Sequence, residues 1–280
     1  MTTETVIQPV ARNGSIQPAL SHAELDTLKQ SFSEDGYVVV RNVVSRAKLA
    51  DLHAQVVGEF ERAKGSGGLF SGGGLVSGHL NFSAGEAARF AYQELQARGI
   101  TDLLRAISPQ SVREPNVAGN FNLPNSVTQH FHMDRRFTNE FMIANVAVVD
   151  TDLVNGAIDV IPGSHKTFYP YWRFALERAS RAHTRLPMKA GDVLVRVSNL
   201  WHRGMPNHSA APRPMLAFTW EDGGSVYDDP FQLDGGKIVF RPNWFRPSRL
   251  GRLRERTFVA APFTYSAYRV VDSLISNKSY

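Results

Sequence analysis

Residues 129–137 read QHFHMDRRF, with polar groups that can bind metal at every second position. Side chains along a β-strand alternate between its two faces. A strand here therefore places three such groups on one face, His130, His132 and Asp134. The residues between them, Phe131 and Met133, are apolar and face the other side, as Gln129 does in a regular strand. The pattern indicates either a half-buried strand with a wet face or part of a metal site.

A metal site needs a further ligand from elsewhere in the chain. His132 and Asp134 can reach one cation from a single strand face, and His202, in NLWHRGMPNHSAAPRP, can supply a second imidazole. Two imidazoles and one carboxylate leave coordination positions open, as in non-haem Fe(II) oxygenases. A structural site would close those positions with protein ligands. The His-x-Asp pair alone is a weak signal, since a histidine satisfied by hydrogen bonds in a strand gives the same spacing.

Two longer stretches extend the motif. Residues 155–165 read NGAIDVIPGSH and residues 202–213 read HRGMPNHSAAPR. Both resemble the phytanoyl-CoA dioxygenase family of Fe(II)/2-oxoglutarate oxygenases, in which N-G-x-x-x-V-x-P-G-S-H lies between H-x-D and the distal histidine. After that histidine the family shows glycine, asparagine and serine and then arginine, which here are Gly204, Asn207, Ser209 and Arg213. FSEDGYVVVRNVVSRAKLADL is also similar to the family's first helix and strand, so the resemblance covers most of residues 21–220.

The resemblance implies roles for particular residues. His132, Asp134 and His202 are expected to bind Fe(II), and 2-oxoglutarate and O₂ complete the set of cofactors. Arg213 is expected to hold the distal carboxylate of 2-oxoglutarate, because a guanidinium binds a carboxylate bidentately. We also expect 2-oxoglutarate contacts from Asn120, Asn122 and His130, and substrate contacts from His79, Arg135 and Arg203. Halogenating relatives lack the carboxylate ligand, so the presence of Asp134 favours hydroxylation of an unactivated C–H bond in a small-molecule metabolite.

Other functions remain open. The same iron set serves desaturases, cyclases and epimerases, and a cupin-like protein can keep the sheet without turnover. A nucleic-acid-directed demethylase has support only from the arginine cluster in residues 241–256, RPNWFRPSRLGRLRER, and the chain lacks the basic, aromatic-rich stripes that stack bases. The same arginines suggest an anionic or carrier-linked substrate, although a solvated helix face around SRLGRLRER is the simpler interpretation. Oligomeric state is not indicated.

The elements that position these residues follow from local patterns. Residues 1–20 read as a flexible tail and residues 21–280 as one domain. SHAE at Ser21 has capping-box spacing, a buried strand is expected from Gly36, and a second capped helix from Ser45. Residues 65–81, with seven glycines, match no phosphate-binding motif and are expected to form a mobile loop, a candidate lid.

Short β-rich runs separated by turns follow residue 110, with one helical insertion at YWRFALERASRAH. This texture indicates a sandwich or barrel. Together with the resemblance it predicts a mainly β fold with flanking helices: a double-stranded β-helix, or cupin-like jelly roll, with N-terminal helices packed on the outside of the larger sheet.

Bulk composition is that of an ordinary globular chain. Of 280 residues, 42% are hydrophobic and 20% charged, and the net charge of +5 is mild. No apolar run is long enough to span a bilayer, and the first residues show no secretion signal. The absence of cysteine excludes disulfides and thiolate chemistry, and it fits a cytoplasmic location.

Overall fold

The ten strands of the described chain form two antiparallel sheets. The structure, a computed structural model, describes residues 18–66, 74–111, 113–241 and 249–275. The larger sheet has the order β1 (Tyr37–Val40), β7 (Val193–Val197), β4 (Met142–Ala147), β9 (Arg213–Thr219), β3 (Asn116–Asn122), β2 (His79–Ser83) and β10 (Val239–Arg241). The smaller sheet has the order β6 (Thr184–Leu186), β5 (Ile158–Val160) and β8 (His202–Arg203).

Between β4 and β9, strands that follow one another in the chain mostly change sheet. The chain passes from β4 in the larger sheet to β5 in the smaller one, returns from β6 to β7, and crosses twice more through β8 to β9. A single bridge between His132 and His202 adds residue 132 to the edge of the smaller sheet. This alternation between two antiparallel sheets is that of the predicted double-stranded β-helix.

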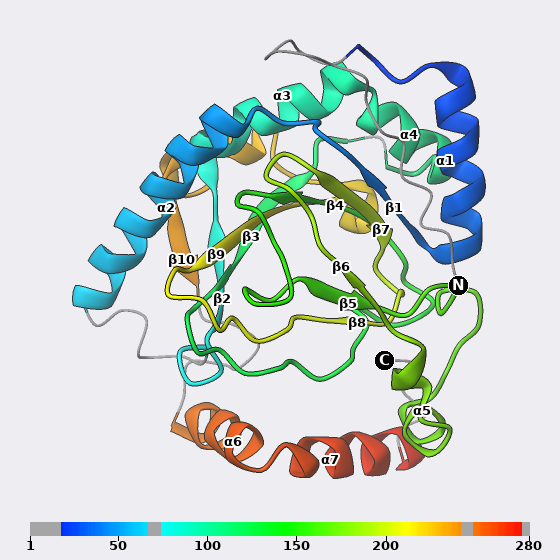
Figure 1. Cartoon of the computed structure of the whole chain (residues 1–280), viewed down its shortest axis with the longest axis vertical. Helices are drawn as coiled ribbons and strands as arrows, with labels where there is room; N and C mark the ends of the chain where they lie inside the picture. Colours follow the sequence, from blue (N-terminus) through cyan, green and yellow to red (C-terminus); the bar gives the residue numbers. More distant parts are fainter. Residues whose placement is uncertain (1–17, 67–73, 112, 242–248, 276–280) are drawn as a thin grey trace.

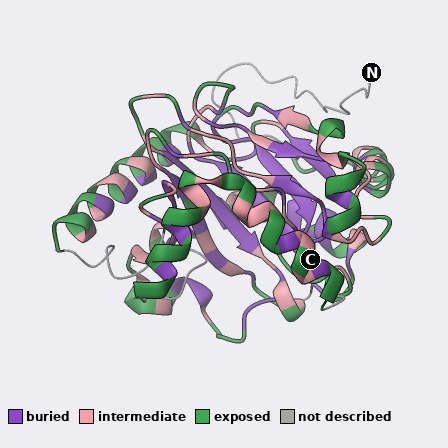
Figure 2. Ribbon diagram, turned by 90° about the horizontal axis from the view of Figure 1, so that it is seen from below, coloured by how far each residue is buried: buried purple, intermediate pink, exposed green. Residues whose placement is uncertain are grey.

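Four helices cover one side of the larger sheet. They are α1 (His22–Asp35), α2 (Arg46–Gly65), α3 (Arg89–Arg98) and α4 (Ile100–Ile107), and they form an arc around the sheet (Figure 1). Helix α2 buries the stripe Leu49, Leu52, Val56 and Phe60. The ring of Phe60 lies 4.9 Å from that of Phe121 on β3. The helices and the sheet thus share one apolar core (Figure 2).

Helix starts agree in part with expectation. Ser21 and Glu24 form the predicted capping box at the start of α1, with Gly36 in the left-handed conformation at its end. Ser45 precedes α2 as predicted, but its side chain makes no capping hydrogen bond. Its backbone N–H instead donates to Glu94 of α3 at 2.7 Å, so a contact between helices replaces the local cap.

Three further helices lie on the opposite side of the molecule. They are α5 (Tyr171–Leu176), within the predicted helical insertion, and the C-terminal pair α6 (Arg249–Ala260) and α7 (Pro262–Ile275) (Figure 1). Short 3₁₀ turns complete the chain: η2 (Gly85–Ala88), η3 (Ala179–Ala182), η4 (Glu221–Gly223) and η5 (Pro230–Gly236). Among the described residues, no helix is both long and apolar enough to cross a membrane.

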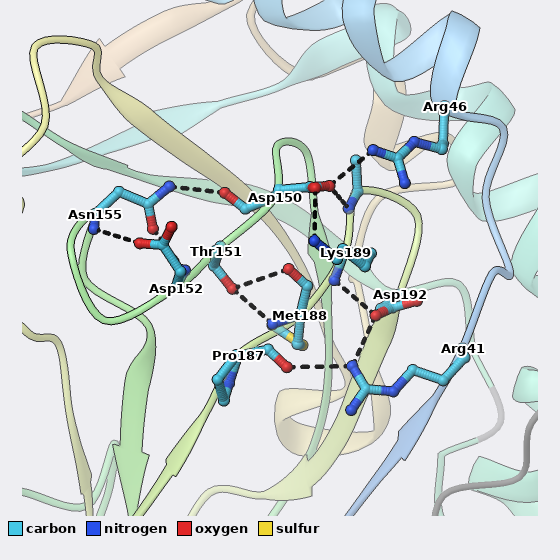
Figure 3. Close-up of polar contacts among 11 residues, drawn as sticks. Arg41, Arg46, Asp150, Thr151, Asp152, Asn155, Pro187, Met188, Lys189 and Asp192 are labelled. Carbon is cyan, nitrogen blue, oxygen red and sulfur yellow. Dashed lines mark hydrogen bonds and ion pairs between the residues drawn. The ribbon is translucent and has the colours of Figure 1, made fainter.

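A polar cluster fastens the turn between β6 and β7 to its neighbours (Figure 3). The Arg41 guanidinium donates to the carbonyl of Pro187 at 3.1 Å and to Asp192 at 2.8 Å. Asp150 accepts from Arg46 at 2.8 Å and from Lys189 at 3.1 Å. These contacts tie the start of α2 to turns at one end of the β-helix, although the turns lie far from α2 in the sequence.

Two expectations about local structure were wrong. Residues 129–137 are not a regular strand: only the bridge at His132 is formed, although Phe131 and Met133 are buried as predicted. The expected glycine-rich loop ends early, because β2 begins at His79. Seven residues of the candidate lid, 67–73, lie outside the described residues. Residues 74 and 77 are held by Glu255 of α6, which accepts from both backbone N–H groups.

Candidate metal centre

Three potential ligands from two distant parts of the chain come together at the edge of the smaller sheet. The backbones of His132 and His202 exchange two hydrogen bonds of 3.0 Å, and the centres of their rings lie 4.4 Å apart. The backbone N–H of Asp134 donates to the carbonyl of Ser198 at 2.9 Å. One ligand atom from each of the three side chains lies within 4.8 Å of the others. This donor set and spacing fit a single metal ion.

Backbone carbonyls orient both imidazoles. Nδ1 of His132 lies 2.9 Å from the carbonyl of His130, and Nδ1 of His202 lies 3.0 Å from that of Leu200. A carbonyl can only accept, so Nδ1 carries the proton in each ring and Nε2 is the atom that could bind a metal ion. Burial lowers the pKa of His202 to about 3 and also lowers the pKa of His132. Both rings are therefore neutral at pH 7, as metal binding requires.

An arginine holds the carboxylate. Arg196 on β7 donates to Oδ2 of Asp134 at 2.6 Å and, through Nε, to Asn145 on β4 at 3.1 Å. The other carboxylate oxygen, Oδ1, lies 3.5 Å from Nε2 of His202. Burial on its own raises the pKa of Asp134, but the Arg196 guanidinium and the two imidazoles outweigh it and hold the pKa below its usual range. The ligand is thus ionised, with one oxygen turned to the histidine.

The cluster opens into a partly open cavity of about 170 Å³ between the two sheets. Strand register builds its opposite wall, because His79, Asn122 and Arg213 are direct partners across β2, β3 and β9. Side chains at paired positions share a face of the sheet, and all three line this cavity. Asn120, two residues before Asn122 on β3, also lines the cavity. Its Nδ2 atom donates a hydrogen bond to Asn81 at 2.9 Å.

Arg213 is the most unusual group in the cavity. Its side chain is 5% exposed, its Nε atom has no hydrogen-bond partner, and no carboxylate among the described residues pairs with it. Burial lowers its pKa to about 10, so the guanidinium is still charged at pH 7. A buried charge without a partner is costly. The cavity is therefore built to receive a small anion, and a dicarboxylate that chelates a metal fits that description.

The turn between β8 and β9 delivers this arginine. Asn207 is fully buried, and its side chain donates to the carbonyls of Asn122 at 3.2 Å and Ala211 at 2.8 Å. Gly204 lies so close to the loop before His132 that a Cβ atom there would stand 2.8 Å from the side-chain oxygen of Gln129. The glycine and asparagine of the 202–213 motif thus shape the turn, and Gly204 also lines the metal cavity.

A buried aspartate fastens the smaller sheet. Asp159 on β5 is 0% exposed and accepts from Arg185 on β6 and from Arg203 on β8, the latter at 2.8 Å. Because β8 has only two residues, His202 and Arg203, this pairing fixes the strand that carries the distal histidine. Arg203, expected at the substrate, therefore also has a structural role.

The remaining candidates are more dispersed. His79 lines the cavity with Nε2 against the carbonyl of Val127 at 2.6 Å. His130 does not share the face of His132, because the segment is irregular, and its ring stacks on Tyr265 of α7 at 4.0 Å in a second cavity, together with Arg203. Arg135 forms an ion pair with Glu221 and lines neither cavity. The structure thus brings Asn120, Asn122 and His79 to the metal cavity, but not His130, Arg135 or Arg203.

Sequence reasoning did not find Arg196, Gln129 or Asp159. Gln129 lines the metal cavity and accepts from the backbone N–H of Gly204 at 2.8 Å, whereas a regular strand would turn it away. Arg196 alternates with valines in DVLVRVS, and a charged residue inside an otherwise apolar strand is the signal that could have singled it out.

Comparisons with known proteins agree with this geometry. The family model for phytanoyl-CoA dioxygenase (PhyH) matches residues 32–215. The fold is similar to the epimerase SnoN in complex with Fe3+, alpha ketoglutarate and nogalamycin RO, with a TM-score of 0.54 at 18% identity over 71% of this chain and 84% of that one. It is also similar to EctD from S. alaskensis with 2-oxoglutarate and 5-hydroxyectoine, with a TM-score of 0.55 at 17% identity over 74% and 78%. AviO1 from Streptomyces viridochromogenes Tue57 gives 0.54 at 19% identity over 71% and 96%.

At these identities the solved structures support the double-stranded β-helix fold, and the family model covers about two thirds of the chain. The match spans both histidines, the aspartate and the arginine of the cavity. The chain therefore belongs to the phytanoyl-CoA dioxygenase (PhyH) family, within the Fe(II)/2-oxoglutarate oxygenase superfamily.

Proposed function

We propose that this chain is an Fe(II)/2-oxoglutarate-dependent oxygenase that hydroxylates an unactivated C–H bond of a small molecule. One observation carries the proposal: three potential ligand atoms within 4.8 Å share a cavity with a buried arginine that has no partner among the described residues. A metal-binding protein without turnover has no use for that arginine, which argues against the non-catalytic alternative.

Each group in the cavity has a part in holding the cofactors. His132, His202 and Asp134 would bind iron through Nε2 and carboxylate atoms, leaving positions open for the co-substrate and O₂. Arg196 would keep Asp134 in place as a charged ligand. Arg213 would bind the distal carboxylate of 2-oxoglutarate, and Asn122, its direct neighbour across the sheet, lines the same side. The donor set and the unpaired charge both fit these cofactors.

When bound, the iron and 2-oxoglutarate supply oxidative decarboxylation coupled to removal of hydrogen from a C–H bond, with succinate and CO₂ as co-products. The protein contributes position and environment. Apolar residues pack beneath the ligands, with Phe131 and Met133 buried behind the histidines. The cavity of about 170 Å³ between the sheets confines the reacting groups to a small space.

The reaction after hydrogen removal is the finer part of the proposal. We favour hydroxylation because Asp134 supplies the carboxylate ligand. SnoN is an epimerase and SnoK a carbocyclase, so members of this fold also carry out those outcomes. A product with one added oxygen atom, seen by mass spectrometry, supports hydroxylation, whereas a product of unchanged mass indicates epimerisation.

The direct test is succinate formation. Purified protein given Fe(II), 2-oxoglutarate and O₂ should release succinate slowly on its own and faster with a true substrate from a metabolite panel. His132→Ala should abolish both rates, because it removes a ligand. Glu61→Gln on the exposed side of α2 is the matched control and should leave them unchanged. Wild-type protein that binds iron but forms no succinate under any condition contradicts the proposal.

A further inference from the structure

A second, larger cavity adjoins the metal cavity. Its volume is about 800 Å³, and it shares two wall residues with the smaller one, His79 and Gln129. We call it the outer chamber. Cavities of a few hundred to about 1,000 Å³ hold drug-sized ligands. The outer chamber is thus large enough for a substrate, and it ends at the residues that border the metal site.

The chamber is formed partly by helices outside the region matched by the family model. Residues 126–131 form one wall and α5 a second, both within that region, whereas α6 and α7, which form the third, lie beyond it. Figure 1 shows α6 and α5 at opposite ends of α7. The chamber therefore lies beneath a cover made by the last helices.

Aromatic rings dominate the chamber walls, with five from Phe131, Tyr171, Phe174, Phe258 and Tyr265. Several are fixed by one another: Tyr171 stacks on Phe174 with ring centres 5.8 Å apart, and Phe258 meets Tyr265 edge-on at 5.2 Å. Aromatic rings in such arrangements favour flat ligands beyond their apolar area alone. The walls suit a ligand with several rings better than a flexible chain.

One acidic group in the chamber is incompletely paired. Glu255 of α6 is 2% exposed and lines the chamber. Its Oε1 atom accepts from Gly74 at 2.6 Å and from Ser77 at 3.1 Å, but Oε2 has no hydrogen-bond partner among the described residues. A buried carboxylate oxygen without a donor is costly. Since Ser77 precedes His79 by two residues, this acceptor lies near the passage to the metal cavity.

Basic residues line the chamber on other elements. Arg203 on β8 pairs with Asp159, and Arg178 follows α5, so the positive charge lies away from α6. The arginines of α6 do not contribute, because Arg252 and Arg254 are exposed and line no wall of the chamber. The expected link between the arginine cluster and an anionic substrate therefore finds no support in this cavity.

We infer that the outer chamber is the substrate site and that it binds a polycyclic molecule. This molecule carries a hydrogen-bond donor, such as a protonated amine, and Glu255 accepts the hydrogen bond. That the bound molecule is a substrate rests on the proposed function, but its binding to the outer chamber does not require iron. The aromatic walls hold the rings, and Glu255 orients the donor end beside His79 and the metal cavity.

Two three-ring probes test this directly. 9-Aminoacridine is protonated at neutral pH and carries an amine, whereas acridine has the same ring system and is uncharged. Binding of each to the full-length protein, without iron or 2-oxoglutarate, is followed by fluorescence titration. The variants are Glu255→Gln and Phe258→Ala. Their matched controls are Glu61→Gln on α2 and Phe263→Ala, whose ring is 73% exposed on α7.

We expect 9-aminoacridine to bind wild type in a 1:1 complex, more tightly than acridine. Glu255→Gln should weaken 9-aminoacridine about 10-fold or more, the effect of losing a charge-assisted hydrogen bond, and leave acridine within about 2-fold. Phe258→Ala should weaken both probes about 2- to 10-fold. Glutamine keeps an oxygen for the N–H groups of residues 74 and 77, and a thermal melt by circular dichroism checks that each variant is folded.

Several outcomes overturn the inference. Failure of both probes to bind wild type shows that the chamber does not accept rings. Equal losses for the two probes in Glu255→Gln exclude a role for the carboxylate in reading a donor. Binding unaffected by Phe258→Ala places the probes elsewhere. Because iron is absent throughout, probe binding can succeed while succinate formation fails, so the inference and the proposed function are tested separately.

Discussion

Arg213 is expected to contribute to anion binding at the expense of protein stability. Its guanidinium is buried, charged and without a partner among the described residues. Such a group lowers the stability of the protein by itself and contributes affinity only when an anion arrives. Strand register places Arg213 directly opposite Asn122 of β3, and the turn before it is held by Asn207.

Replacing this arginine should separate the two effects. Arg213→Met should raise the free energy of unfolding by about 1 kcal/mol, because it removes an uncompensated buried charge. The same variant should weaken 2-oxoglutarate binding at least about 100-fold, the cost of a buried charge-assisted pair. Denaturant unfolding and calorimetric titration measure the two quantities. Arg62→Met on α2, where the side chain is 71% exposed, is the control. Wild-type affinity for 2-oxoglutarate in Arg213→Met contradicts the assignment.

His79 should make stability depend on pH. Burial lowers its pKa from 6.5 to about 4. The unfolded chain therefore takes up a proton below about pH 6.5 that the folded chain refuses. The neutral, buried His79 therefore costs no stability above about pH 6.5, and the free energy of unfolding decreases as the pH falls from 6.5 toward 4.

At about pH 5 the loss amounts to roughly 2 kcal/mol, since each pKa unit corresponds to about 1.4 kcal/mol. The measurement is urea unfolding at about pH 7.5 and pH 5. His79→Gln should show a smaller difference between the two pH values than wild type, and His22→Gln, at an exposed position of α1, should show the same difference. An unchanged difference in His79→Gln means that the imidazole titrates normally in the folded protein.

At the scale of elements, β8 is too short to hold the distal histidine alone. Two residues form few ladder bonds, so the strand depends on Asp159, which joins β5 to β6 and β8. The metal centre thus rests on a salt-bridge cluster that touches no cofactor.

Asp159→Asn should therefore lower both stability and metal affinity. It leaves two arginines without a charged partner, one 21% and the other 23% exposed. We expect a loss of about 2–3 kcal/mol and iron binding weakened about 10-fold or more, as for other groups behind metal ligands. Asp102→Asn, where the side chain is 67% exposed, is the control. Unaltered iron affinity in a destabilised Asp159→Asn protein shows that β8 keeps its position without the cluster.

Local patterns made several elements predictable from the sequence. The capping box of Ser21 and Glu24 and the burial of the apolar residues Phe131 and Met133 were confirmed, because both follow from neighbours in the chain. The irregular backbone around His132 was not predictable, since its only bridge is to a strand 70 residues away. Arg196 and Asp134 likewise pair across 62 positions, and such contacts leave no period in a single sequence.

At the scale of the whole molecule, the two cavities differ in the parts of the chain that form them. The metal cavity lies within residues 32–215, where sequence motifs name most of its polar groups. The outer chamber depends on α6 and α7, for which the sequence indicated a helix at SRLGRLRER but not what it covers. Cofactor chemistry was therefore predictable, whereas the chamber emerged only from the packing of distant helices.

The central claim is that His132, Asp134 and His202 bind one ferrous ion. Anaerobic calorimetric titration of wild type and His202→Ala with Fe(II) tests it most directly. The account predicts one tightly bound iron per wild-type chain and affinity at least about 100-fold weaker in the variant, which loses a ligand together with its place in the chelate. Equal affinity and stoichiometry in the two proteins would contradict it, because the iron would then be bound at another site.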